Sequence, residues 1–223
     1  MIDKLYHIRF ELFFLSMLLI LFGSLLFPVI IFQEEIIHIF FLVNILSGIL
    51  LVSKTRKFLL GYLILFILGV SFFAYTLVQK LSIEADYQVV RLAIYTLFYA
   101  LVTLEIIRQV WHAKKVGKNV IIGLMSAYIS LGLLAFFMFL SIELIHPSSF
   151  SGSGITGTIE QKSDALLYFS YITLLTIGYG DIVPLTPIAQ KATVLAGLIG
   201  QFYIVIITAV VVEKYIMNKK GNT

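Results

Sequence analysis

The stretch T-L-L-T-I-G-Y-G-D, residues 173–181, decides the fold of this chain. It lies between a short apolar segment and a long one, and Gly178 and Gly180 alternate in it with Ile177 and Tyr179. Glycine readily adopts backbone conformations with positive φ. The alternation therefore predicts a loop in which successive carbonyl oxygens point the same way, which is a set of ligands for a cation.

The rest of the chain consists mostly of apolar runs of membrane length. Of its 223 residues, 60% are hydrophobic and 13% are charged, whereas about 25% are charged in soluble domains. A helix needs about 20 residues to cross the hydrocarbon core of a bilayer. Six runs predict an all-α membrane protein with six transmembrane helices: Leu12–Phe32, Ile36–Ser53, Phe58–Leu81, Tyr87–Val110, Val120–Ile145 and Pro187–Met217.

The segment between the fifth and sixth runs is of a different kind. Residues 147–162 are rich in Ser and Gly and predict an exposed, mobile loop. Ser163 and Asp164 are expected to cap a short helix from Ala165 to about Leu175, which is well under a full crossing. A re-entrant helix of this length would bring the glycine loop to membrane depth, where irregular backbone is tolerated only in protein or beside water.

The orientation follows from the distribution of basic residues, because Lys and Arg near helix ends favour the cytoplasm. We therefore expect both termini to be cytoplasmic, in a plasma membrane that is prokaryotic by default. Short basic clusters of this kind favour contact with membrane lipid and do not indicate nucleic-acid binding. Twelve of the 16 Lys and Arg residues lie on one predicted side: Lys4, Arg9, Lys54, Arg56, Lys57, Arg108, Lys114, Lys115, Lys118, Lys214, Lys219 and Lys220.

The six residues Thr176–Asp181 resemble the selectivity filter of the potassium channel family. The resemblance extends over residues 120–217 and implies a prokaryotic-like, four-plus-two tetrameric cation channel. Four copies of such a loop surround one axis, and their carbonyl oxygens replace the hydration shell of K⁺. The resemblance implies a homotetramer without an organic cofactor, whose K⁺ ligands are Thr176, Ile177, Gly178 and Tyr179.

The same resemblance implies a set of residues that support the loop. Tyr168 is expected to donate its hydroxyl to Asp181. Ile172 occupies a position where some two-helix bacterial channels have a glutamate, so that carboxylate is missing here. The expected supporting residues are Gly180, Asp181, Tyr168, Phe169 and Thr173.

The last helix is expected to be capped by Thr186 and to begin at Pro187. Gly200 lies where similar channels have a hinge glycine, and Gly197 is a nearby candidate. Two interpretations stay open, because glycines in membrane helices also permit close helix packing. The resemblance further implies a pore-lining stripe of Thr208, Val212 and Ile216, in which Val212 and Ile216 form an apolar gate.

The chain is expected to divide into a four-helix domain at 1–111, an interfacial linker at 112–119 and a pore domain at 120–223. A voltage sensor needs several charges in the membrane field. The fourth run has only Arg91 and Arg108 near its ends and Glu105 between them. We therefore expect weak or absent voltage dependence. Within the second run, Asn44 predicts a hydrogen bond between helices.

The sequence also bears on three functions other than a channel: an enzyme, a transporter subunit and a non-conducting partner subunit. The four histidines are scattered, and the sequence has no cysteine, nucleophile motif or phosphate-binding glycine loop, so an enzyme is not expected. A channel-like subunit of a potassium transporter and a non-conducting partner of another channel stay open. Because few residues follow the last run, regulation is expected to come from an unidentified separate subunit or ligand.

Overall fold

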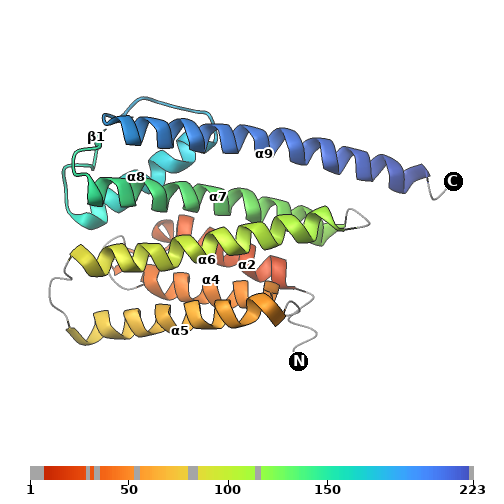
Figure 1. The fold of residues 1–223 in the computed structure, drawn as a ribbon, viewed down its shortest axis with the longest axis horizontal. Coiled ribbons are helices and arrows are strands. Elements are labelled where there is room, and N and C mark those ends of the chain that lie inside the picture. Colours follow the sequence, from red (N-terminus) through yellow and green to blue (C-terminus); the bar gives the residue numbers. More distant parts are fainter. Residues whose placement is uncertain are drawn as a thin grey trace. The chain divides into compact units, whose positions relative to one another are not determined.

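The computed structural model is almost wholly helical (Figure 1). Its contacts divide the chain into two compact units, and α7 (Lys118–Ile145) runs from the first unit into the second. Unit 1 comprises Met1–Ala113 and Gly117–Ala127, and unit 2 comprises Lys114–Val116 and Tyr128–Thr223. The division therefore falls at Tyr128, inside α7. The structure describes residues 8–28, 31–32, 36–52, 56–79, 85–113 and 117–220.

Unit 1 is a helical cluster in which α4 packs against α2, α5 and α6. The second, third and fourth predicted helices agree with α4, α5 and α6 to within two residues at each end. The elements of this unit are α2 (Arg9–Phe22), the 3₁₀ turn η1 (Gly23–Leu25), α4 (Ile37–Val52), α5 (Arg56–Gln79) and α6 (Ala85–Trp111).

A fully buried asparagine connects three of these helices. The Asn44 amide of α4 donates to the Ser16 hydroxyl at 2.8 Å and to the Phe13 carbonyl at 3.3 Å, both on α2. The Tyr99 hydroxyl of α6 donates to the Asn44 oxygen at 2.7 Å. The predicted hydrogen bond between helices is confirmed, and the apolar interior carries a satisfied polar network.

The first predicted helix ends earlier than expected. We predicted one helix over Leu12–Phe32, but α2 ends at Phe22 and η1 follows. A Cβ at Gly23 would overlap the ring of Phe32, so glycine at this position allows the chain to turn back. The sequence also suggests that Pro28 would kink this helix, but Pro28 lies beyond the end of α2 and does not kink it.

Unit 2 contains the rest of α7, two helices and a two-stranded sheet. Thr186 accepts from the Ala189 amide at 3.4 Å, as predicted for the cap of α9. The strands pair antiparallel, with Phe150 opposite Pro184 and Gly152 opposite Ile182. The elements are β1 (Phe150–Gly152), α8 (Ile159–Leu174), β2 (Ile182–Pro184) and α9 (Pro187–Lys220).

The segment predicted as a mobile loop over 147–162 is partly ordered into secondary structure, which corrects that prediction. It contains β1, and α8 begins six residues before the predicted start at Ala165. The reason is a capping box at Thr158 and Gln161, in which each side chain bonds the other residue's backbone N–H. This cap precedes the predicted one at Ser163 and Asp164.

Within the described residues, three helices are long and apolar enough to cross a membrane: Leu92–Trp111, Lys118–Ile145 and Pro187–Glu213. Two shorter apolar helices cover Ile39–Leu51 and Leu60–Ser71. The structure thus supports a helical membrane protein, whereas the full set of six crossings and the re-entrant helix stay predictions.

Candidate functional site

The glycine loop follows α8 directly and leads into β2. Its backbone alternates, with positive φ at Thr176 (58°), Gly178 (59°) and Gly180 (81°). Glycine adopts such values at little cost, but a β-branched residue there is an outlier that the surroundings must enforce. The two glycines have the expected conformation, and Thr176 joins them unexpectedly.

A single carbonyl holds the middle of this loop. The Ile172 oxygen, in the last turn of α8, accepts from the Ile177 amide at 2.9 Å and from the Gly178 amide at 3.3 Å. The Thr176 amide donates to the Thr173 carbonyl at 3.0 Å. The N–H groups are thus directed back to the helix end.

The carbonyl oxygens of the loop remain open. Among the residues that the structure describes, no backbone N–H donates to the carbonyls of Thr176, Ile177, Gly178 or Tyr179. Uncommitted oxygens in consecutive residues are the ligands that a hard cation needs.

The loop is exposed in the single chain. The side chain of Tyr179 is 72% exposed and that of Ile177 is 47% exposed. A Cβ placed on Gly178 or Gly180 would meet no atom within 4 Å. The loop is predicted to lie at membrane depth. We therefore expect other protein chains to cover its exposed apolar and aromatic side chains.

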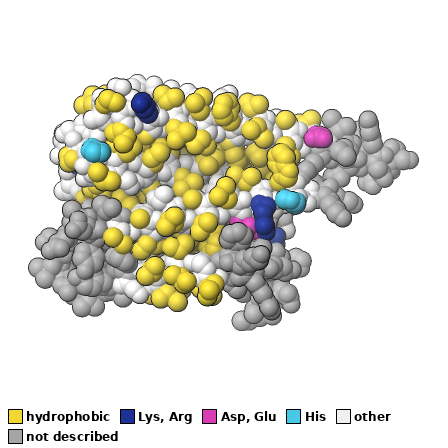
Figure 2. All heavy atoms as spheres, in the orientation of Figure 1, with side chains coloured by type: hydrophobic (Ala, Val, Ile, Leu, Met, Phe, Trp, Pro, Cys, Tyr) yellow, Lys and Arg dark blue, Asp and Glu magenta, His cyan; other side chains and the backbone are white. Residues whose placement is uncertain are grey.

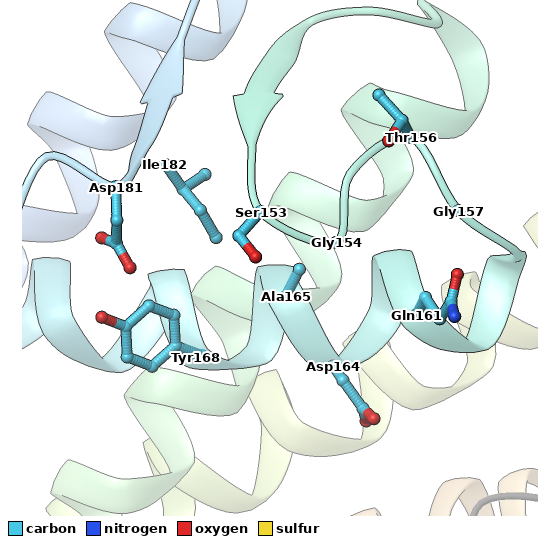
Figure 3. Close-up of a pocket in the computed structure, with 10 residues that line it drawn as sticks. All are labelled: Ser153, Gly154, Thr156, Gly157, Gln161, Asp164, Ala165, Tyr168, Asp181 and Ile182. Carbon is cyan, nitrogen blue, oxygen red and sulfur yellow. The ribbon is translucent and has the colours of Figure 1, made fainter.

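Tyr168 and Asp181 lie together at the outer end of the loop. Figure 3 shows the Tyr168 hydroxyl of α8 facing the Asp181 carboxylate. Their hydrogen bond, with desolvation and the negative charge of Asp181, raises the pKa of the Tyr168 hydroxyl above its ordinary value. The structure thus brings this predicted pair into contact across the loop.

Phe169 lies on another face of α8. Its buried ring packs against Phe139 of α7 at 5.2 Å and Phe150 of β1 at 5.6 Å, measured between ring centroids. Phe139 and Phe150 also contact each other at 5.5 Å. The three rings form part of the buried core of unit 2, so Phe169 packs α8 against α7 and β1.

A buried carboxylate in α7 is the feature that sequence reasoning missed. The Glu143 side chain is 1% exposed and accepts from the amides of Ser148 at 3.2 Å, Ser149 at 2.9 Å and Phe150 at 3.2 Å. The Lys162 ammonium of α8 completes the set at 3.2 Å. From the sequence alone, Glu143 could be an exposed loop carboxylate that concentrates cations or one that only solvates its loop, and its burial corrects both interpretations.

The contacts of Glu143 extend to the start of α9. The Ser149 carbonyl accepts from the Leu185 amide at 2.8 Å, and the Thr186 hydroxyl donates to the Ser149 hydroxyl at 3.1 Å. These contacts connect α7 and α8 to the residues just before β1 and α9, at the end of the sheet where Phe150 pairs with Pro184.

The C-terminal end of α8 contacts both long helices of unit 2, α7 and α9. The Tyr128 hydroxyl of α7 donates to the Leu174 carbonyl at 3.2 Å, and its ring stacks on Tyr203 of α9 at 5.5 Å. A Cβ at Gly200 would lie 2.6 Å from that same Leu174 oxygen. Gly200 therefore permits a close approach of α9 to the end of α8, which favours the packing interpretation of this glycine.

The remaining predicted pore residues lie along α9. Gly197 has no atom within 4 Å of an added Cβ, and Thr208 and Val212 are exposed. The Thr208 hydroxyl donates to the Ile204 carbonyl at 2.7 Å. The side chain of Ile216 lies outside the described residues. The hinge and the gate stay predictions.

The charges of α6 form a local pair. Arg108 contacts Glu105 at 3.1 Å, and the Gln109 amide donates to the same carboxylate at 3.0 Å. Glu105 is buried, whereas the Arg108 side chain is half exposed. The side chain of Arg91 lies outside the described residues. The buried Glu105 carboxylate thus has two partners, Arg108 and Gln109, near the end of α6.

Comparison with known proteins agrees with the position of this site. Residues 157–217 match a family model described as "Ion channel". The match extends from the cap of α8 through the loop and along α9. No curated protein and no solved structure matches the chain. The match supports the interpretation of this chain as an ion channel embedded in a membrane.

Proposed function

We propose that this chain forms a potassium-selective channel that conducts K⁺ passively through a homotetrameric pore. The observation that carries the proposal is the loop after α8, in which the amides of residues 176–178 are bonded to the helix end and the four carbonyls of residues 176–179 accept no backbone N–H of the described residues. The match to an ion-channel family over residues 157–217 supports the same function.

K⁺ is the substrate of this mechanism. The carbonyl oxygens of Thr176, Ile177, Gly178 and Tyr179, with the Thr176 hydroxyl at the inner end, would replace water around the ion. One chain offers one oxygen at each level, which is too few for a cation that sheds its hydration shell. Four copies around an axis complete each ring, so the proposed function requires the tetramer.

The surface of the chain is consistent with such an assembly in a bilayer. Hydrophobic side chains cover most of the described face in Figure 2, and charged side chains are scattered. Helix α9 buries its small residues Ala192, Ala196 and Gly200. Large apolar residues remain exposed over a broad arc of this helix: Val194, Leu195, Leu198, Ile199, Phe202, Ile204, Val205 and Ile206. Neighbouring copies and lipid would cover them.

We further propose that the protein lies in the plasma membrane with cytoplasmic termini, that six helices cross it, and that α8 is re-entrant. The basic residues between the predicted crossings support this orientation. Among the described side chains of α6, the charges of Glu105 and Arg108 form a pair near the helix end, which supports weak voltage dependence, because voltage sensing needs several charges that move through the field.

Liposome flux separates this proposal from its alternatives. Purified protein is reconstituted without any partner, and uptake of K⁺ is compared with uptake of Na⁺ down equal gradients. Passive K⁺ uptake at least about a hundredfold faster than Na⁺ uptake is the expected result. Uptake that requires an added energy source would indicate a transporter subunit, and silent but tetrameric protein would indicate a non-conducting partner.

A further inference from the structure

A cavity lies beside the glycine loop in unit 2. Its volume is about 590 Å³, and three segments form its walls (Figure 3). They are the loop after β1, which contributes Ser153 and Thr156, helix α8, which contributes Ala165 and Tyr168, and Asp181 with its neighbour Ile182. None of the proposed K⁺ ligands lines this cavity.

The loop that covers the cavity is fixed at both ends. At one end, Gly152 pairs with Ile182 in the sheet, and a Cβ on Gly152 would overlap the Asp181 carbonyl. At the other end, the capping box at Thr158 holds the chain against α8. Ile155 between them is buried, and its amide donates to the Gly152 carbonyl at 3.3 Å. A pre-formed pocket binds a ligand without the cost of ordering its walls.

The polar groups in the pocket favour a positive charge. Among the described residues, no Lys, Arg or His lines the cavity, whereas Asp181 directs its carboxylate toward the Tyr168 hydroxyl at one end. Lys162, which follows the lining residue Gln161, is bonded to Glu143 at 3.2 Å. The charge of Asp181 is therefore not neutralised by a basic side chain of the pocket.

The size of the pocket argues against a bare metal ion. A hard divalent cation needs six or more oxygen ligands at about 2.0–2.6 Å. Within the described part of the chain, no three acidic, His or Cys residues gather around one point. The volume is within the range of about 300–1,000 Å³ that is usual for small-molecule sites. The exposed hydroxyls of Ser153 and Thr156 add hydrogen-bonding groups away from Asp181.

We propose that this pocket binds a small organic cation, of the amino-sugar or amino-alcohol class, from the outer side of the membrane. Its ammonium group pairs with Asp181, and its hydroxyl groups bond the loop at Ser153 and Thr156. Asp181 directly follows Gly180, so the occupant touches the outer end of the glycine loop. The location outside the membrane rests on the proposed function, whereas the binding itself does not.

The test is direct binding to the assembled protein in lipid nanodiscs, followed by titration calorimetry. The probe is glucosamine at mildly acidic pH, where its amine is charged, and the matched control is glucose, which has a hydroxyl in place of that amine. We expect saturable binding of glucosamine and at least about tenfold weaker binding of glucose, the size of one lost charge-assisted contact. Equal binding of the two sugars, or no binding of glucosamine, would overturn the proposal.

A pair of loop variants tests the location. Ser153→Phe fills the cavity, whereas Ser151→Phe places the same ring on an exposed strand position outside the lining. We expect Ser153→Phe to weaken glucosamine binding at least about tenfold, because it excludes the ligand from a closely packed site, and Ser151→Phe to leave it unchanged. Circular dichroism and gel filtration check that both variants fold and assemble, and unchanged binding by folded Ser153→Phe would refute this site.

K⁺ flux measured on the same preparation keeps the two proposals separate. Glucosamine binding without K⁺ flux would leave the pocket in place and refute the channel. K⁺ flux without glucosamine binding would support the channel and refute the pocket. It would indicate that a neighbouring copy covers the cavity in the tetramer.

Discussion

Two tight turns of unit 2 share two backbone features but differ in the groups that complete them. Each contains a non-glycine residue with positive φ, Ser148 at 66° and Thr176 at 58°. Each directs successive amides to one acceptor, the Glu143 carboxylate for the first turn and the Ile172 carbonyl for the second. The first turn is closed by Lys162, whereas the second is left with four open carbonyls.

The difference shows where this chain stabilises itself and where it relies on something else. A strained non-glycine residue costs on the order of 1–3 kcal/mol. At Ser148 this cost is offset within the chain, by a buried carboxylate with four donors. At Thr176 the surroundings remain exposed, so we expect K⁺ and neighbouring copies to complete the structure. The turn at Ser148 supports the fold, and the turn at Thr176 is the proposed K⁺ site.

The largest expected effect is at the open turn. Gly178→Ala places a Cβ where φ is +59°, although no neighbour would clash with it. The strain should displace the open carbonyls and lower K⁺ flux at least about a hundredfold, because carbonyl position carries the selectivity. The measurement is liposome flux.

Gly61→Ala is the matched control for that substitution. Gly61 also has no atom within 4 Å of an added Cβ, but its position is inside α5 with helical φ. Its flux should equal that of the unmodified protein. Normal selectivity in Gly178→Ala would show that the backbone of the loop does not ligate the ion.

The second effect is at the closed turn. Glu143→Ala leaves three amides and the Lys162 ammonium without their acceptor. Removal of one partner from a buried pair costs about 3–5 kcal/mol, so thermal unfolding followed by circular dichroism should shift strongly to lower temperature. Glu160→Gln, at an exposed position on α8, serves as the control and should not shift it. An unchanged unfolding temperature in Glu143→Ala would contradict the support role.

A third comparison separates the two glycines of α9. Gly200→Ala brings a Cβ within 2.6 Å of the Leu174 carbonyl and should destabilise the protein by about 1–3 kcal/mol. Gly197→Ala meets no neighbour and should stabilise the helix by up to about 1 kcal/mol. Thermal unfolding measures both. Equal effects on stability, with a change of open probability in both variants, would favour a hinge over close packing.

The smallest effect concerns Tyr168 and Asp181. Their contact raises the pKa of the Tyr168 hydroxyl, so its contribution to stability is complete below the ordinary tyrosine pKa of about 10 and is lost as pH rises through the raised value. Asp181→Asn should lower the pKa of Tyr168 toward the ordinary value. NMR of labelled tyrosines, with the Tyr168 signal assigned from Tyr168→Phe, measures this change. An unchanged titration would show that the pair is not in contact.

The sequence predicts the open turn well and the closed turn poorly. Helices α4 to α7 and the start of α9 follow from apolar runs and from Thr186 with Pro187, which are local signals. The conformations of Gly178 and Gly180 follow from the absence of a side chain. The role of Glu143 depends on amides of a turn that has no periodic pattern, and on Lys162, which is 19 residues away.

Two further misses have the same kind of cause. The positive φ of Thr176 runs against the preference of a β-branched residue, so no local rule predicts it. The early end of the first helix coincides with a close approach of the Phe32 ring to Gly23, which only the folded chain reveals. The capping box at Thr158 and Gln161 could have been predicted from the sequence, because Thr and Gln three residues apart are its usual pattern.

The most direct test of the central claim is the reversal potential of single channels in a planar bilayer, with K⁺ on one side and Na⁺ on the other. The open carbonyls of residues 176–179 predict reversal near the K⁺ equilibrium potential, with an open probability that changes little on stepping the voltage. Currents that reverse near zero would contradict the claim, because a loop that passes both ions equally does not ligate K⁺ through a selective set of oxygens.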